Sequence, residues 1–363
     1  MIANPRVMPQ PRSSPRIFAL AEGDLGEVAR FIAKQSGREA DAVQAHLRWF
    51  LLENPARLPR HPLGFGLCCE SELVGCILCC PQVFRFQKKP IELMGSSSFY
   101  VDEQHRGWGG RIFLSYCRLA ATWPLFGTSA NLAAAGLWKA AGASPVPYSD
   151  GELLGVLRWP PVVEEIVHRR RSSPVLVRLA RGPASNIAGL LSSLKIGRHA
   201  DDDLRPLSSA EEAAALCNHD FVPRLTAERD LPYIRWRYFS GRDETTQMFA
   251  FRSRRPDREV LVAVNQRLRG YRGQINTLNL LDVYPEVGPD EHLGIVAQLI
   301  RRYGKAVDAV VLRNQDEAQR QSYRAKGFHW RTFEAPIGWF LDRSRQLDTR
   351  NWYAVPADGD GLI

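Results

Sequence analysis

The chain has 363 residues, of which 45% are hydrophobic, and its 48 lysines and arginines exceed its 39 acidic residues to give a net charge of +9. This length is too great for one average domain and suits two. No run of 18 uncharged apolar residues is present, and the Pro-, Arg- and Ser-rich residues 1–15 lack an apolar stretch. We therefore expect neither a membrane-spanning helix nor a secretory signal, and we interpret residues 1–15 as a flexible arm.

The spacing of apolar residues predicts alternating strands and helices in the first half of the chain. Asp24 opens a helix with Val28, Phe31 and Ile32 on one face, and residues 70–72 form the turn of a hairpin. The predicted order is a strand at 16–20, helices from 24 and at 41–52, strands at 65–69, 73–80 and 91–101, a helix at 112–121, a strand at 125–129 and a helix at 132–141. Periodicity alone indicates a mixed α/β class.

Five cysteines crowd into the hairpin: Cys68, Cys69, Cys76, Cys79 and Cys80. Cys76 and Cys79 are separated by two residues, which is the spacing of many zinc ligands. Because the segment reads strand, turn, strand, and cysteine behaves as a small hydrophobe in strands, we favour structural packing and predict no metal site. A metal or redox role is the alternative. Seven cysteines without a regular disulfide framework favour a reducing cytoplasm.

The most informative segment is residues 101–110, where the end of a strand runs into a basic, glycine-rich turn that opens a helix. Backbone N–H groups in such a turn and the positive end of the helix dipole both favour a pyrophosphate. The alternative interpretation is a plain connection in which glycine supplies a positive φ. Arg111 leaves two outcomes open, because its side chain either blocks a phosphate or binds it directly.

This segment resembles the signature of the GNAT superfamily, whose members transfer acyl groups carried on coenzyme A. The signature is a strand ending in Val-x-Pro-x-x, followed by Arg-Gly-x-Gly-x-Gly or Ala. The residues that fall in register with it are Val101, Arg106, Gly107 and Gly109. Glu103 stands where proline is common, and Arg111 stands where the last small residue is expected.

A second GNAT signature reads Asn-x-x-Ala-x-x-Leu-Tyr-x-x-x-Gly-Phe, and residues 131–143 match its spacing. Asn131 takes the place of the asparagine, whereas Trp138 replaces the tyrosine and Ala143 the phenylalanine. The resemblance implies that coenzyme A contacts a set of residues in these two motifs: Val101, Arg106, Gly107, Trp108, Gly109, Gly110, Arg111 and Asn131.

Prolines and a basic cluster at 168–171 interrupt the pattern between residues 161 and 200. We interpret this segment as a connection between domains that contains one strand, Val175–Leu179. The basic cluster is interpreted as a solvated surface, with a patch for an anionic substrate or cofactor as the alternative.

The second half repeats the order of the first, which suggests duplication. Its predicted elements are a strand at 204–207, a helix after the capping sequence 208–211, a helix at 226–239, strands at 248–251, 260–264 and 275–283, a helix at 293–303, a strand at 307–312 and a helix at 316–326. Pro232 marks an alternative start for the helix at 226–239. Tyr323, Gly327 and Phe328 again match the second signature, with Asp316 in place of the asparagine.

The resemblance therefore implies two tandem GNAT-like domains, each with a central, mostly antiparallel twisted sheet flanked by helices. The expected boundaries are an arm at 1–15, an N-terminal domain at 16–160 with the coenzyme-A turn, the connection at 161–200, a degenerate C-terminal domain at 201–345 and a tail at 346–363. In the second half, acidic side chains in residues 287–292 occupy the position where phosphate would bind. We therefore expect coenzyme A to bind the N-terminal half.

Acyl transfer requires a group that removes a proton from the attacking amine and a donor for the oxyanion. The candidate bases are Glu92, Asp102, Glu103 and His105. Glu92 is equally suited to a surface position, and His105 to covering a phosphate. The resemblance makes Tyr323 the candidate acid, because the indole of Trp138 has only an N–H donor. Ser97 and Ser98 are candidates for substrate binding, with a role as strand fillers as the alternative.

Three functions remain open. The first is an acyl-CoA-dependent N-acyltransferase, with acetyl-CoA as the expected donor, acting on the amine of a small molecule or amino sugar by direct attack. The second is a transferase like the Fem-type enzymes, which use aminoacyl-tRNA; basic charge favours it, whereas the turn after Val101 argues against it. We interpret the aromatic-basic segment 233–238 as a helix that buries its aromatic side chains, with stacking on nucleic-acid bases as the alternative. The third is a catalytically inactive GNAT-like binding protein.

Overall fold

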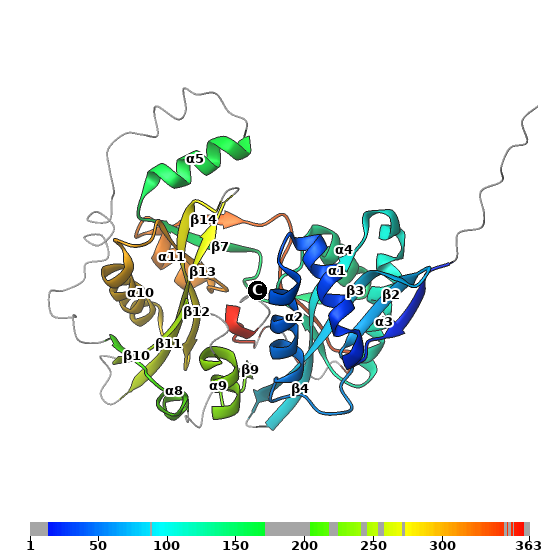
Figure 1. Ribbon diagram of the computed structural model, residues 1–363. Helices are drawn as coiled ribbons and strands as arrows, with labels where there is room; N and C mark the ends of the chain where they lie inside the picture. The colour runs from blue at the N-terminus through cyan, green and yellow to red at the C-terminus, as the bar shows by residue number, and fades with distance from the viewer. Residues whose placement is uncertain are drawn as a thin grey trace, which may run out of the picture. The chain divides into compact units, whose positions relative to one another are not determined.

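The computed structural model describes residues 14–87, 89–170, 204–217, 224–240, 245–252, 258–270, 273–344, 347, 350 and 352–358, without the side chains of 166–170. The chain divides into two compact units, which are shown in Figure 1. The first unit comprises Met1–Pro81 and Met94–Trp123, and the second comprises Gln82–Leu93 and Pro124–Ile363. Each unit is described separately below.

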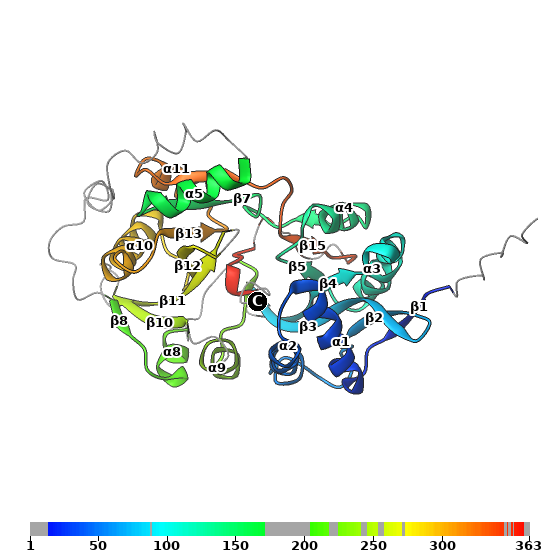
Figure 2. The same cartoon turned by 45° about the horizontal axis from the view of Figure 1, so that its top comes forward.

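The first unit contains strands with helices on both sides, as Figure 2 shows for α1 and α2 on one face of the sheet and α3 on the other. Its elements, with η marking short 3₁₀- or π-helices, are β1 (Arg16–Ala19), η1 (Glu22–Asp24), α1 (Leu25–Ser36), α2 (Ala40–Leu47), η2 (Arg48–Leu52), β2 (Gly64–Cys69), β3 (Glu72–Phe86), β4 (Lys89–Val101), η3 (Glu103–Trp108), α3 (Gly109–Cys117) and η4 (Arg118–Ala121). The hairpin end of β3 and β4 belongs to the second unit.

The helix α1 illustrates how the sequence of the first unit selects its elements. Val28, Phe31 and Ile32 recur at helical spacing and are all buried, so that one face of the helix packs into the core. The helix ends where Gly37 adopts a φ of 68°, because glycine enters this left-handed conformation without a steric penalty.

The second unit contains the remaining elements. They are β5 (Leu125–Gly127), α4 (Leu132–Ala140), β6 (Ser144–Pro145), β7 (Gly151–Val156), α5 (Trp159–Arg170), β8 (Leu204–Pro206), α8 (Ala210–Leu216), β9 (Thr226–Ala227), α9 (Leu231–Phe239), β10 (Thr246–Arg252), β11 (Glu259–Arg269), β12 (Ile275–Tyr284), α10 (Pro289–Tyr303), β13 (Ala309–Arg313), α11 (Glu317–Arg324), β14 (His329–Thr332), β15 (Trp339–Leu341) and η6 (Pro356–Asp358).

The strands form two mixed sheets with helices on their faces, as expected of two GNAT-like domains. The order in one sheet is β1-β2-β3-β4-β5-β15-β6, with β9 paired to β3, and the order in the other is β14-β7-β13-β12-β11-β10-β8. In the second sheet only β12 and β13 pair in parallel. Its apolar face packs with α10 and α11 around a buried core that includes Leu278, Leu299 and Leu312.

Two strands, β7 and β15, each join the sheet that is formed mainly by the other half of the sequence. β7 follows the elements of the first half, yet it pairs with β13 and β14 in the second sheet. β15 follows the elements of the second half, yet it pairs with β5 and β6. Phe340 of β15 packs with Phe126 of β5 and with Trp352 near the end of the chain, in a cluster of buried aromatic side chains. The sequence analysis predicted neither strand.

Most predicted elements of the first half are present, including the hairpin, the strand that ends at Val101 and the helix at 132–140. The segment expected to connect the domains begins inside a helix, α5, which the sequence analysis did not predict. The start expected at residue 226 is wrong, because Thr226 and Ala227 pair with β3 and α9 begins at Leu231, next to the alternative start at Pro232. Residues 1–13 of the expected arm, the predicted strand 175–179 and residues 359–363 of the tail lie outside the described residues.

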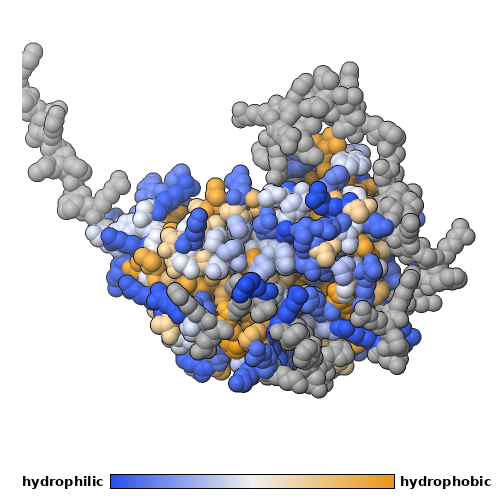
Figure 3. Space-filling model, turned by 180° about the vertical axis from the view of Figure 1, so that it is seen from behind, coloured by the Kyte–Doolittle hydropathy of each residue, from blue (hydrophilic) through white to orange (hydrophobic). Residues whose placement is uncertain are grey.

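Within the described part of the chain, no helix is both long enough and apolar enough to cross a membrane. On the face shown in Figure 3, hydrophilic and hydrophobic residues are interspersed.

Candidate functional site

The turn after β4 places the start of a helix next to a strand end, as the sequence predicted. Residues 103–108 form the short helix η3, and α3 begins at Gly109. The first backbone N–H groups of a helix have no partner within it. The Trp108 side chain at the N-cap makes no capping bond, and the first turn of α3 carries no acidic side chain. The Gly109 N–H donates to the Arg106 carbonyl of η3, so the amides that follow it and the positive end of the helix dipole are the groups suited to an anion.

The glycines of this turn are required neither by the backbone nor by packing. Neither Gly107 nor Gly109 has a positive φ, so the interpretation that they serve a left-handed turn is wrong. A Cβ added at Gly107 would have no atom within 4 Å, and one at Gly109 would lie 3.9 Å from its nearest neighbours. At Gly151, in contrast, an added Cβ would clash with Trp330 at 2.4 Å. The missing side chains thus leave open space above the turn.

Two arginines flank this space. The Arg111 guanidinium lies 4.4 Å from the centre of the Trp108 ring, which is a cation–π contact that holds it beside the first turn of α3. Arg106 forms an exposed ion pair with Glu103 at 3.5 Å, and such pairs contribute little to stability. Both guanidiniums remain at the surface, where an anionic ligand can reach them.

His105 lies inside the same turn. Its Nδ1 is buried and, among the described residues, has no hydrogen-bond partner. Buried polar atoms are nearly always paired, so an unpaired ring nitrogen suggests a group that is completed by a ligand. Within residues 101–111, all of which the structure describes, this nitrogen is the single buried side-chain atom without a partner.

The strand that leads to the turn is irregular at two residues expected to bind substrate. Ser98 has a φ of 49° in the middle of β4, in the left-handed region that non-glycine residues seldom adopt. Its carbonyl accepts a hydrogen bond from the Cys76 thiol at 3.4 Å, and its hydroxyl lies 3.3 Å from that of buried Ser97. Conformations of this kind persist where neighbouring structure enforces them, often at functional sites.

Tyr116 fixes α3 against this strand. Its hydroxyl is fully buried and donates to the Met94 carbonyl at 2.7 Å. Burial raises the pKa of this phenol well above its usual value, so it stays protonated as a donor. The sequence analysis did not single out Tyr116, because a tyrosine on an apolar helix face carries no signal of its hydrogen-bond partner.

Asn131 and Glu92 occupy different positions from the turn residues. The Asn131 side chain caps α4 by accepting from the Ala134 amide at 2.9 Å, so its oxygen already has a structural role. Glu92 lies near the start of β4, nine residues before Val101, which corresponds to roughly 30 Å of extended strand. Both residues belong to the second unit, whereas Ser97, Ser98 and the turn belong to the first.

Tyr323 lies in the core of the second unit. The side chain is completely buried, and its hydroxyl lies 2.5 Å from His292 Nδ1 and donates to the His292 carbonyl at 3.1 Å. Both contacts are satisfied when Nδ1 carries the proton and donates to the phenol oxygen. Burial lowers the pKa of His292 to about 4 and raises that of Tyr323 well above its usual value. Near neutral pH both groups are therefore uncharged.

The corresponding helix start in the second unit has the opposite character. Gly288 precedes α10 and provides no side-chain cap, Pro289 lies in the first turn, and Asp290 and Glu291 place two carboxylates there. Proline has no N–H to offer, and carboxylates repel a phosphate. This structure agrees with the expectation that phosphate is disfavoured in this half.

Three of the five hairpin cysteines, Cys76, Cys79 and Cys80, are buried in the core, and Cys68 and Cys69 are partly buried. Cys76 and Cys79 are buried in β3, and burial raises the pKa of the Cys76 thiol to about 12 and also raises that of Cys79. Such thiols remain protonated and pack as small apolar side chains.

The structure as a whole has the GNAT fold. A solved structure from Enterococcus faecalis V583, described as a probable N-acyltransferase, is similar over 90% of this chain and 72% of its own, with a TM-score of 0.57 and 9% identity. A GCN5-related N-acetyltransferase from Anabaena variabilis is similar over 90% and 72%, with a TM-score of 0.54 and 11% identity.

The N-myristoyltransferase of Saccharomyces cerevisiae, solved with bound myristoyl-CoA, is similar over 95% of this chain and 85% of its own, with a TM-score of 0.53 and 11% identity. No protein-family model matches the sequence, and no curated protein matches it. At these identities the likeness concerns the fold, and the chemistry has to be argued from the residues.

Proposed function

We propose that this protein is an acyl-CoA-dependent N-acyltransferase, which moves an acyl group, most simply acetyl, to the amine of a small molecule or amino sugar. The observation that carries this proposal is the start of α3: no side chain caps it, its first turn has no acidic residue, and Gly107 beside it leaves open space that the fold does not need. The GNAT fold of the chain agrees with it.

In this proposal the donor's pyrophosphate binds the amides of residues 107–111 and the guanidiniums of Arg106 and Arg111. Arginine presents a planar fork that matches phosphate oxygens, so Arg111 binds the phosphate rather than blocking it. Trp108 supports the Arg111 side chain, and Val101 and Gly110 border the path of the donor. Asn131 contributes by holding the start of α4.

The proposed chemistry is direct attack of a neutral amine on the thioester carbonyl. A C–N bond forms, the carbonyl becomes a tetrahedral oxyanion, and the C–S bond then breaks to release the thiolate. The irregular backbone at Ser98 turns main-chain groups away from regular pairing, which suits an oxyanion donor, and the hydroxyls of Ser97 and Ser98 contact the acceptor. The proton lost by the amine passes to His105 Nδ1 and from there to solvent or the thiolate.

Two other catalytic candidates are placed less well for this chemistry. Glu92 lies in the strand far before the turn, so it serves as a base only for an acceptor that extends along β4. Tyr323 has no solvent exposure, and its hydroxyl is engaged with His292. We therefore propose that Tyr323 stabilises the core of the second unit and that the leaving thiolate is protonated without it.

Calorimetric titration of the full chain with acetyl-CoA tests the proposal. The double variant Arg106→Ala, Arg111→Ala should weaken binding by about 10-fold or more. A charge-assisted contact contributes up to about 3 kcal/mol, and about 1.4 kcal/mol corresponds to a tenfold change in affinity. Arg118→Ala, which removes an exposed arginine at the other end of the same helical segment, is the matched control and should leave the affinity unchanged. Absence of binding by acetyl-, longer acyl- and free coenzyme A would refute the proposal.

A non-catalytic coenzyme-A-binding protein is the second candidate. It is favoured by the two positions where the GNAT signature has its tyrosine: Trp138 is buried and has no acidic proton, and Tyr323 is buried in the core. Thiol release from acetyl-CoA, followed across a panel of small amines and amino sugars, separates the two candidates. Binding without any turnover across the panel would favour the second.

A further inference from the structure

The second unit contains a pocket where its two parallel strands separate. β12 and β13 pair only from Thr277–Asn279 to Ala309–Val311, and beyond this point both strands continue without each other. The pairing of β12 with β11 also shifts register at Leu281, so that this residue has no partner in β11. The pocket encloses about 310 Å³, counting its opening to solvent, and its lining includes Asp282, His292, Arg313, Gln315 and Tyr353.

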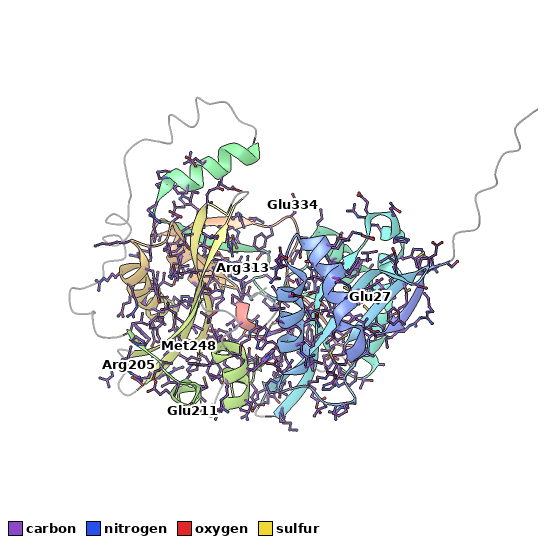
Figure 4. All side chains as sticks on the ribbon, in the orientation of Figure 1. Glu27, Arg205, Glu211, Met248, Arg313 and Glu334 are labelled. Carbon is purple, nitrogen blue, oxygen red and sulfur yellow. The ribbon has the colours of Figure 1, made fainter. Side chains whose placement is uncertain are left out.

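Arg313 brings uncompensated positive charge to this pocket. Its Nε donates to Glu152 Oε2 at 3.0 Å, and its two terminal nitrogens have no partner among the described residues. Glu152 is buried, and Arg269 and Arg331 also pair with it, so three guanidiniums meet a single carboxylate. Figure 4 labels Arg313 in the second unit. Such an excess of donors favours a further anion.

The arginines also outweigh the effect of burial on Glu152. Burial by itself raises the pKa of this carboxyl, but Arg313, Arg269 and Arg331 together lower it below its usual value. Glu152 is therefore ionised at neutral pH, and the local charge is that of three cations and one anion.

Gln315 supplies an unused acceptor in the same pocket. Its side chain is 7% exposed, and its Nε2 donates to the Arg313 carbonyl at 2.7 Å, which fixes the orientation of the amide. Its Oε1 is buried and has no partner among the described residues. A buried carbonyl oxygen without a donor is rare in folded proteins and indicates a missing ligand group.

Three other polar side chains of the pocket already have partners. Asp282 accepts from Arg229 at 2.7 Å and from the Tyr238 hydroxyl at 2.9 Å. His292 Nδ1 contacts the Tyr323 hydroxyl, and the Tyr353 hydroxyl donates to the Val283 carbonyl. Arg313 and Gln315, two residues apart in the chain, offer a ligand one guanidinium fork and one carbonyl acceptor.

We propose that this pocket binds a small carboxylate with a hydrogen-bond donor on the neighbouring carbon, that is, an α-amino or α-hydroxy acid. The carboxylate accepts from the terminal nitrogens of Arg313, and the ammonium or hydroxyl donates to Gln315 Oε1. An anion with acceptors alone, such as acetate or sulfate, would leave this oxygen unpaired. The proposal concerns the second unit and does not depend on acyl transfer by the first.

Ligand-detected NMR titration of the full chain tests the proposal with glycine, glycolate, acetate, methylamine and sulfate. At least one of glycine and glycolate should bind about 10-fold tighter than acetate, methylamine and sulfate, because only these two probes satisfy both protein groups. The preferred one of the two shows whether the donor is an ammonium or a hydroxyl. Equal binding of acetate, or no binding of any probe, would overturn the proposal.

A matched pair of variants locates the binding. Arg313→Gln should weaken binding of the preferred probe by about 10-fold or more, whereas Arg331→Gln removes another arginine that pairs with Glu152 but does not line the pocket, and should change it by less than about 3-fold. Equal losses would mean diffuse attraction and would overturn the proposal. If Arg313→Gln fails to fold, a crystal of the unaltered chain soaked with the probe decides: density on Arg313 and Gln315 supports the site, and its absence there refutes it.

Discussion

The starts of α3 and α10 occupy equivalent places in the two halves but have opposite chemistry. Each follows a long strand with an irregularity, at Ser98 in β4 and at Leu281 in β12. The first turn of α3 has glycine and arginine without an acidic side chain, whereas that of α10 has a proline and two acids. The strand-to-helix architecture is thus retained in both, and a few side chains decide whether a phosphate is attracted or repelled.

The difference indicates how a repeated fold divides its tasks. Uncapped amides at a helix start bind anions only if nearby charges permit it. Asp290 and Glu291 stabilise α10 by interacting with its dipole, so the acids that exclude a phosphate also support the helix. In α3 the corresponding stabilisation is absent, which is expected where the helix start is kept for a ligand.

The sharpest way to break the comparison is to give α3 the charge of α10. Gly107→Glu should weaken acetyl-CoA binding by roughly 100-fold, since a carboxylate about 5 Å from a phosphate costs about 3 kcal/mol at an effective dielectric constant of about 20. The open space at Gly107 accommodates the side chain without refolding. Gly107→Gln measures the effect of size alone, and Gly136→Glu places the same charge on α4. Equal losses in the Glu and Gln variants, measured by calorimetry, would show that charge is not decisive.

A second test concerns His292, which α10 buries. Because its folded pKa of about 4 lies below the unfolded value near 6.5, the unfolded chain takes up the proton first, and stability is lost as the pH falls between these values. We expect a loss of about 2–3 kcal/mol between pH 7 and 4.5, measured by urea unfolding.

His292→Gln should remove this part of the pH dependence, and His329→Gln, at an exposed histidine, should retain it. The difference between the two variants isolates His292 from carboxylates that titrate in the same range. If both variants lose stability to the same extent, the buried histidine does not control the acid sensitivity of the second unit.

Removing the acids of α10 sharpens the comparison from the other side. Asp290→Asn with Glu291→Gln should lower the free energy of unfolding by about 1 kcal/mol, because the helix loses two favourable charges in its first turn. Calorimetry should still show one acetyl-CoA bound per chain. Pro289 still lacks an N–H for a phosphate, and residues 353–356 still line the pocket beside β12 where a second donor would have to bind. A stoichiometry of two would show that the acids alone distinguish the halves.

The smallest expected effect is at Arg106. Its ion pair with Glu103 is exposed, so Arg106→Gln should change the melting temperature very little. The affinity for acetyl-CoA should fall by about 3- to 10-fold, because one phosphate contact is lost near solvent. Arg118→Gln is the control. A large change in stability with unchanged affinity would place Arg106 in the fold instead of the site.

Local sequence was sufficient for the elements whose pattern is strong and whose partners are near in the chain. The capping sequence at 208–211, the helix face of α1 and the strand ending at Val101 are of this kind. The helix α5 was missed because its prolines were taken as breaks, although proline is tolerated in the first turn, where its N–H would have no partner. The start of α9 follows the same rule, since Pro232 lies in its first turn.

The remaining features depend on partners far away in the sequence. Nothing in the residues of β7 or β15 tells which sheet they join, because periodicity specifies a strand but not its neighbour. In the candidate site, the motifs predicted the turn and its glycines, whereas the φ of Ser98 and the anchoring of α3 by Tyr116 arise from packing. The pocket at Arg313 has no motif at all, since its charges come from four strands.

The crossing of β7 and β15 means that the two halves of the sequence are interlocked. A fragment ending near residue 200 would carry away one strand of the second sheet and lack β15, and the complementary fragment would have the reverse defect. Ligand binding measured on either fragment alone would therefore not represent binding by the full chain. Both pieces co-expressed should instead reassemble, so that a chain severed between 171 and 203 behaves as a split protein whose parts depend on each other.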